Sequence, residues 1–139
     1  MRIERWRTWL LSLVVVLGLT GCAGTGASTA GTAVAVTDLS SVAGKWTGLL
    51  ELAGSGTRED FVELTVDRSG AYRAVTARTI GAMDAQGRVA VSGGKILLQG
   101  ERGSRATATL YTQQTQRALL VEGATPEGRR FSARLRQQP

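Results

Sequence analysis

The feature that most constrains this chain is a series of short runs in which apolar and polar residues alternate, separated by turn-forming residues. A period of two puts successive side chains on opposite faces of a β-strand, and helical periodicity is hard to find between Leu39 and Pro139. The pattern predicts an all-β domain. We expect eight strands, over residues 44–53, 59–67, 71–80, 87–92, 95–100, 105–112, 116–123 and 129–136.

The residues between these runs predict tight turns. Asp67–Gly70 and Asp84–Gly87 share an Asp followed three residues later by Gly, and Gly93–Gly94 suits a two-residue hairpin. Short loops join antiparallel neighbours, so the strands follow the chain as a meander. With an even number of strands, the first and last can pair and remove both edges. The prediction is a small eight-stranded antiparallel up-and-down barrel; an open sheet or a two-layer sandwich is the alternative.

One face of each run is consistently apolar, and this face is expected to point into the barrel. A slip of one residue would expose every apolar side chain, so the alternation fixes the register. An eight-stranded barrel is just wide enough for side chains to fill, and we expect a filled interior. The expected inward apolar residues are Trp46, Leu50, Leu52, Val62, Leu64, Val66, Val89, Val91, Ile96, Leu98, Leu110, Leu119, Val121, Phe131 and Leu135, with Gly48, Ala106, Ala108 and Ala133 interleaved.

The start of the first expected strand carries a short motif. Gly44-Lys45-Trp46 resembles the G-x-W start of the lipocalins and their calycin relatives. The resemblance implies an eight-stranded meander barrel, often with a small apolar ligand in a cup. It also implies that Trp46 packs across one closed end against a basic side chain. We expect Arg134 or Arg136 to be that cation–π partner.

The N-terminal residues carry a separate signal. A basic start at residues 2–7 precedes an apolar run from Trp9 to Leu19, the layout of a secretory signal peptide. An uncleaved membrane anchor is the alternative, although the run is too short to span a bilayer. Leu19-Thr20-Gly21-Cys22 resembles the lipobox of bacterial lipoproteins, and Cys22 is the only cysteine. The resemblance implies a diacylglycerol on Cys22, cleavage before it and acylation, typically with palmitate, of its amine.

This resemblance also implies a cellular location and a domain organisation. Ala23 follows the cysteine where an acidic residue often signals retention at the inner membrane, so we expect the periplasmic face of the outer membrane. Residues 1–21 are the expected signal peptide, and residues 22–38 a lipidated cysteine with a flexible linker of small residues. An extra strand from Thr32 to Val36 is the alternative. Residues 39–139 form the expected single, monomeric barrel domain.

Composition excludes much catalytic chemistry. The chain has no histidine, and lipidation would use its cysteine, which excludes Ser-His and Cys-His catalysis and most zinc and copper sites. Acid–base catalysis by a pair of carboxylates remains chemically possible, but we expect the candidate carboxylates to lie on the solvent-exposed surface. We therefore predict a non-enzyme without cofactor or metal. The candidate carboxylates are Glu51, Glu59, Asp60, Glu63 and Asp67.

Positive charge gathers near the C-terminus, where seven arginines stand against Glu122 and Glu127. Arginine suits capture of phosphate or carboxylate, so an envelope protein or an anionic lipid or glycan is the expected partner. Alternatively arginine is simply the default cation, since the chain has fifteen Arg and two Lys. Aromatic residues are too sparse for nucleic-acid binding. The expected basic face contains Arg105, Arg117, Arg129, Arg130, Arg134 and Arg136.

The run at 71–80 allows two orientations. One face carries Tyr72, Thr76 and Arg78, and the other Val75 and Ala77. If the first face points inward, three polar groups converge inside an apolar barrel, which is typical of a small-molecule site. We expect the second face to fill the core instead.

Three functions are consistent with these patterns. We rank first a non-catalytic barrel that acts through its outer surface as a structural, assembly or inhibitory partner. A lipocalin-like binder of a small amphiphile or lipid ranks second. A carboxylate-based hydrolase ranks last.

Overall fold

The computed structural model describes residues 31–56, 59–77 and 82–139. None of the helices in these residues is long and apolar enough to cross a membrane. The elements are β1 (Thr32–Val34), the 3-10 helix η1 (Leu39–Ser41), β2 (Gly44–Leu52), β3 (Glu59–Val66), β4 (Ala71–Ala77), β5 (Ala82–Ser92), β6 (Lys95–Gly100), β7 (Arg105–Gln113), β8 (Gln116–Ala124) and β9 (Arg130–Gln137).

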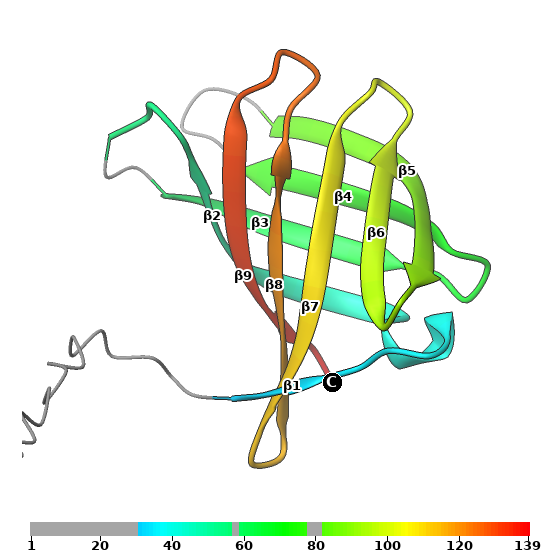
Figure 1. The fold of residues 1–139 in the computed structure, drawn as a ribbon. Helices are drawn as coiled ribbons and strands as arrows, with labels where there is room; N and C mark the ends of the chain where they lie inside the picture. Colours follow the sequence, from blue (N-terminus) through cyan, green and yellow to red (C-terminus); the bar gives the residue numbers. More distant parts are fainter. Residues whose placement is uncertain (1–30, 57–58, 78–81) are drawn as a thin grey trace, which may run out of the picture.

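Strands β2 to β9 form a closed barrel (Figure 1). Each strand pairs antiparallel with the next along the chain, and β9 returns to pair with β2, from Trp46 opposite Gln137 to Leu52 opposite Phe131. The predicted eight-stranded up-and-down barrel is therefore confirmed. The open sheet and the sandwich are excluded, because β2 and β9 leave no free edge between them.

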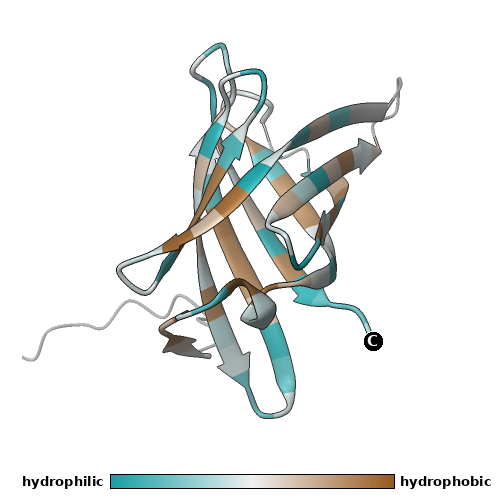
Figure 2. Cartoon of the chain, turned by 90° about the vertical axis from the view of Figure 1, so that its right-hand side faces the viewer, coloured by the Kyte–Doolittle hydropathy of each residue, from teal (hydrophilic) through white to brown (hydrophobic). Residues whose placement is uncertain are grey.

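The alternation places apolar side chains inside the barrel as predicted. All of the expected inward apolar residues are buried or half-buried. Figure 2 shows apolar and polar bands alternating along the strands. Among the residues whose exposure is described, three large apolar side chains point outward and are exposed: Leu49, Phe61 and Leu97.

One predicted turn is wrong. Asp84–Gly87 lies inside β5, where Asp84 pairs with Val75 and Gly87 with Tyr72 of β4. The reason is that the Asp84 carboxylate does not cap a turn. It accepts a charge-assisted hydrogen bond from Arg73 of β4 at 2.6 Å, which ties the two strands together.

The expected linker is wrong in its second half, where the alternative strand is present. β1 pairs with β7, with Val34 opposite Leu110, and the Val36 N–H donates to the Gly94 carbonyl oxygen at 3.1 Å. β6 pairs only with the first half of β7, so the backbone of the second half needs another partner. β1 supplies it, and Val36 is buried in the core.

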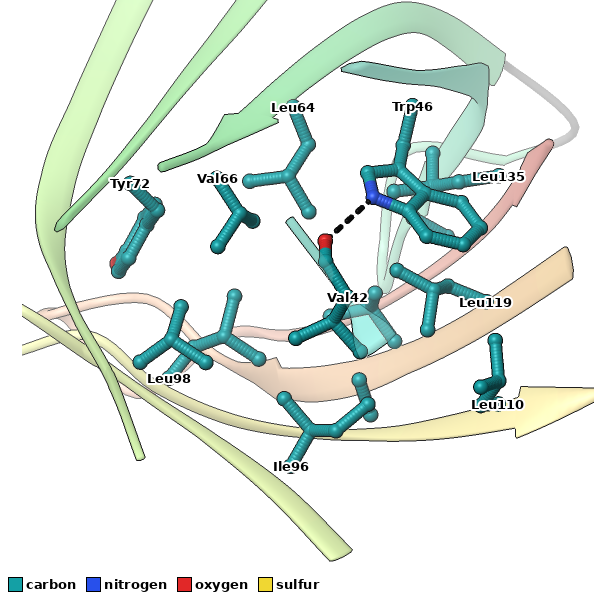
Figure 3. Packing of buried hydrophobic residues seen from close by; sticks show 14 of the residues in the cluster. Val42, Trp46, Leu64, Val66, Tyr72, Ile96, Leu98, Leu110, Leu119 and Leu135 are labelled. Atoms are coloured by element: carbon teal, nitrogen blue, oxygen red, sulfur yellow. Dashed lines mark hydrogen bonds between the residues drawn. The ribbon is translucent and has the colours of Figure 1, made fainter. Parts of the chain in front are cut away.

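The segment between β1 and β2 closes one end of the barrel. Val36 and Val42 are buried there, and Trp46 is 0 % exposed. The Trp46 indole Nε1–H donates to the Val42 carbonyl oxygen at 2.9 Å, as the dashed line in Figure 3 marks. Asp38 caps η1 within this segment by accepting from the Ser41 N–H at 3.3 Å. The resemblance to the lipocalins led us to expect Trp46 at a closed end, and it lies there.

Candidate functional site

Within the described residues, a cavity of about 510 Å³ extends to the other end of the barrel. Leu52 of β2 and Phe131 of β9, a register pair at that end, line it, together with residues of the β6–β7 and β8–β9 turns. Trp46 and Val42 at the closed end do not line it. The expectation of a filled interior is therefore wrong. The volume falls in the range of about 300–1,000 Å³ that is typical of ligand pockets.

The two ends of the interior are filled to different extents, because Trp46 and an inserted segment occupy only one of them. The closed end combines Trp46, Leu110 and Leu119 with the inserted segment that carries Val36 and Val42. By contrast, alanines from three strands line the cavity. These are Ala74, Ala106 and Ala133.

The cavity has an apolar wall and a polar mouth. Its wall is formed mainly by Leu50, Leu52, Val62, Leu64, Leu98, Val121, Phe131 and Leu135, in addition to the three alanines. Its mouth carries Asp84, Gln86, Glu101, Arg102, Ser104, Arg105, Thr125 and Glu127. This division suits a molecule with an apolar body and a polar end.

Most mouth residues were not singled out from the sequence. A usable signal exists, because alternate turns of a meander barrel lie at the same end. The turn at 101–104 and the turn at 125–129 must therefore share one end. Their polar residues could have been grouped on that basis before the structure was known.

Tyr72 points into the barrel, contrary to the favoured orientation of this run. It is 8 % exposed and lines the cavity, as does Thr76, whereas Val75 and Ala77 lie on the outer face. Arg78 lies outside the described residues. The reason is visible in the register, in which Tyr72, Gly87 and Gly100 are neighbours across β4, β5 and β6. Because glycine has no side chain, neither neighbour fills the inward space beside the ring.

The Tyr72 hydroxyl reaches the β6–β7 turn. A Cβ at Gly100 would lie 3.2 Å from this oxygen and would overlap Ser104 Oγ, so Gly100 leaves room for both groups. Burial raises the pKa of Tyr72, a hydrogen bond with Ser104 lowers it in part, and the charge of Glu101 raises it. Tyr72 is therefore a neutral hydroxyl at the upper wall of the cavity.

This raised pKa predicts a loss of stability at high pH. The stabilising contribution of neutral Tyr72 is fully present below its unfolded-state pKa of 10.0 and is lost as the pH rises through the folded-state pKa. Urea unfolding followed between about pH 9 and 11 should show a steeper decline in the wild type than in Tyr72→Phe. Equal declines in the two proteins would contradict this assignment.

The carboxylates at the mouth already have partners. Asp84 Oδ2 accepts from Arg73, and Glu101 Oε2 accepts from Gln86 Nε2 at 2.8 Å. Hydrogen bonds from its own backbone and from Thr125, with the charge of Arg129, lower the pKa of Glu127. By contrast, Arg102 and Arg105 make no ion pair within the described part of the chain.

Arg117 occupies a different place from the one predicted. Its guanidinium carbon lies 5.9 Å from the centroid of the Trp46 ring, and the group donates to Gln137 Oε1 at 3.3 Å and to the Ser41 carbonyl oxygen. Arg134 and Arg136 are exposed on the outer face of β9. The prediction that one of them covers Trp46 is wrong, and Arg117 of β8 has that role instead.

The predicted basic face is correspondingly smaller. Arg117 is half-buried at the closed end and does not belong to it. Arg105 and Arg130 are linked through their common register partner Ala124, and Arg134 and Arg136 continue along β9. Arg129 lies in the adjacent turn, where its guanidinium donates to the Ala53 carbonyl oxygen at 3.1 Å.

The five carboxylates considered for hydrolysis do not line the cavity. Glu51 and Glu59 are exposed register partners, Glu63 forms an ion pair with Lys45 at 3.0 Å, and Asp67 accepts hydrogen bonds within its own turn. Hydrogen bonds, first from Ser69, lower the pKa of Asp67. Within the residues that the structure describes, no three His, Cys, Asp or Glu side chains gather as metal ligands would.

The fold and the cavity together define the chain as a small closed β-barrel with an apolar cup. No protein-family model matches the sequence, and no curated protein matches it. Among solved structures, a redesigned β-barrel is similar, with 12 % identity and a TM-score of 0.48, over 74 % of this chain and 100 % of that chain. The assignment to a closed barrel rests on the strand pairing described above.

Proposed function

We propose that this protein holds a small amphiphilic molecule in its barrel, with the apolar part inside and the polar part at the mouth. The observation that carries the proposal is the apolar-walled cavity of about 510 Å³, which lies at the end of the barrel away from Trp46. Burial of an apolar chain contributes about 25 cal/mol for each Å² removed from water, which makes such a wall a source of affinity. The sequence alone favoured a role for the outer surface over ligand binding, and the cavity supports ligand binding instead.

We further infer that Cys22 is lipidated and that the protein is anchored in the cell envelope, at the periplasmic face of the outer membrane. The lipobox-like residues Leu19–Cys22 support this proposal. Nine residues separate Cys22 from Thr32 at the start of β1, and the ten Cα-to-Cα steps can span at most ~33–36 Å. Since β1 pairs with the far half of β7, at the closed end, the anchor would hold that end and leave the mouth at the far end.

A second candidate function is action through the outer surface as a structural, assembly or inhibitory partner. The exposed side chains of Leu49 and Phe61 favour it, because these residues are register partners on β2 and β3. Arg134 is the partner of Leu49 on the other side. No catalytic role is proposed.

Fluorescence of a neutral apolar probe tests the cavity. The Cys22→Ser chain, exported by the native host, is expected to leave the membrane fraction and to provide protein without its anchor. N-phenyl-1-naphthylamine should gain fluorescence on binding to this protein. Ala74→Trp places a large side chain in the cavity and should weaken binding at least about tenfold, since ligand and indole cannot share the space.

Ala90→Trp is the matched control, because Ala90 is exposed on the outer face of β5 and should leave binding unchanged. Circular dichroism checks that each variant folds, and Ala106→Leu replaces Ala74→Trp if the latter does not. A wild-type protein that does not bind the probe, or a cavity-filling variant that binds it as well as Ala90→Trp, would overturn the proposal in favour of the outer surface.

A further inference from the structure

The carboxylates and the arginines at the mouth of the cavity differ in whether they have partners within the protein. Its three carboxylates, on Asp84, Glu101 and Glu127, are each engaged by groups of the protein itself. Arg102 and Arg105 also line the cavity, yet within the described residues neither takes part in an ion pair. A ligand head at the mouth therefore lies next to two arginines that form no ion pair with a described carboxylate, although Arg105 also lines a second, outer pocket with Glu51 and Glu122.

The β6–β7 turn positions these two arginines. Three backbone hydrogen bonds stabilise it: Gly103 N–H to Gly100 O at 3.0 Å, Gly100 N–H to Ser104 O at 2.8 Å, and Glu101 N–H to Gln86 O at 2.9 Å. Arg102 lies within the turn and Arg105 begins β7. A turn tied in this way holds both Cα atoms in place, so that only the side chains must order when an anion binds.

From this arrangement we infer that the cavity selects single-chain amphiphiles whose head is an anion, a carboxylate or a phosphate, bound by Arg102 and Arg105. The inference rests on the proposed function and adds the chemical class of the ligand. Planar guanidinium groups bind either anion through paired N–H···O bonds. A cationic head would share carboxylates that already accept hydrogen bonds from Arg73 and Gln86, and a neutral head forms no ion pair with a guanidinium group.

Displacement of the bound naphthylamine probe compares heads on one tail. Dodecanoate, dodecyl phosphate, dodecan-1-ol and dodecylamine are titrated below their critical micelle concentrations. One or both anions should displace the probe at concentrations about tenfold lower than the alcohol, the scale expected for one or two charge-assisted hydrogen bonds at a partly exposed site. The better of the two anions identifies whether a fatty-acid-like or a phosphate head is preferred.

The variant Arg102→Gln/Arg105→Gln should lose this preference and bind the anions within about threefold of the alcohol. Arg134→Gln/Arg136→Gln is the matched control, because it removes the same charge from the outer face of β9 and should keep the preference. Equal displacement by anion and alcohol in the wild type, tighter binding of the amine, or an unaltered preference in Arg102→Gln/Arg105→Gln would each overturn the inference. In those cases the proposed function stands, since the amphiphiles still bind. Failure of the probe itself to bind would instead remove the proposed function.

Discussion

Replacing Trp46 by alanine is expected to lower the free energy of unfolding by about 3–5 kcal/mol. Trp46 is 0 % exposed and packs among Leu119, Leu135 and Val42, as Figure 3 shows. Alanine would leave a cavity at the closed end of the barrel. It would also remove the ring beneath Arg117 and the donor that satisfies the Val42 carbonyl oxygen. Urea unfolding followed by far-UV circular dichroism measures the loss.

Trp46→Phe separates packing from hydrogen bonding. Phenylalanine keeps an aromatic ring in the site but cannot donate to the Val42 carbonyl oxygen. An intermediate loss is expected, of which about 1–3 kcal/mol comes from the unsatisfied buried carbonyl. A Trp46→Ala protein within about 1 kcal/mol of the wild type would show that the closed end does not depend on this residue.

The second large effect is expected from Gly48→Ala. Gly48 lies in the middle of β2, and a Cβ there would overlap the carbonyl oxygen of Arg134 in β9. This oxygen belongs to the β2–β9 pair that closes the barrel, so the clash is relieved only by moving the two strands apart. We expect a loss of about 3 kcal/mol, the upper end of the usual cost of overpacking. Hydrogen exchange should then show weaker protection in β2 and β9 than in β5 and β6.

Gly103→Ala is the control for this substitution. Gly103 has φ +94° in the β6–β7 turn, and a Cβ there would have nothing within 4 Å. Alanine at this position therefore meets only the cost of a left-handed backbone, about 1–2 kcal/mol. If both substitutions cost the same, steric closure of the barrel at Gly48 is not the reason for its glycine.

The alternation of side chains predicted the barrel well because it is a local property of the chain. Residues 95–100 were predicted as a strand, and β6 has the same bounds. The inward positions followed from the same pattern. Side chains alternate between the two faces of a strand, so assigning one residue to a face also assigns its neighbours. Closure followed from the even number of strands and the short turns.

Whether an Asp-x-x-Gly sequence forms a turn depends partly on contacts with other strands. Asp67–Gly70 and Asp84–Gly87 show the same sequence pattern, but only the first is a turn. Asp67 Oδ1 accepts from the Ser69 N–H at 2.8 Å, within its own loop. Asp84 instead pairs with Arg73 on the neighbouring strand, a contact that does not exist until β4 and β5 have formed.

By itself, the sequence determined the eight barrel strands, their order and the inward face of most of them. Only the tertiary structure decided that the barrel is hollow and which end holds the cavity. Ala74, Ala106 and Ala133 line one space although they lie on three different strands, whereas Trp46 and the inserted residues Val36 and Val42 occupy the other end. Arg117 meets Trp46 there for the same reason. The level of each side chain along the barrel depends on strand stagger, which is a property of the closed sheet and not of any single run.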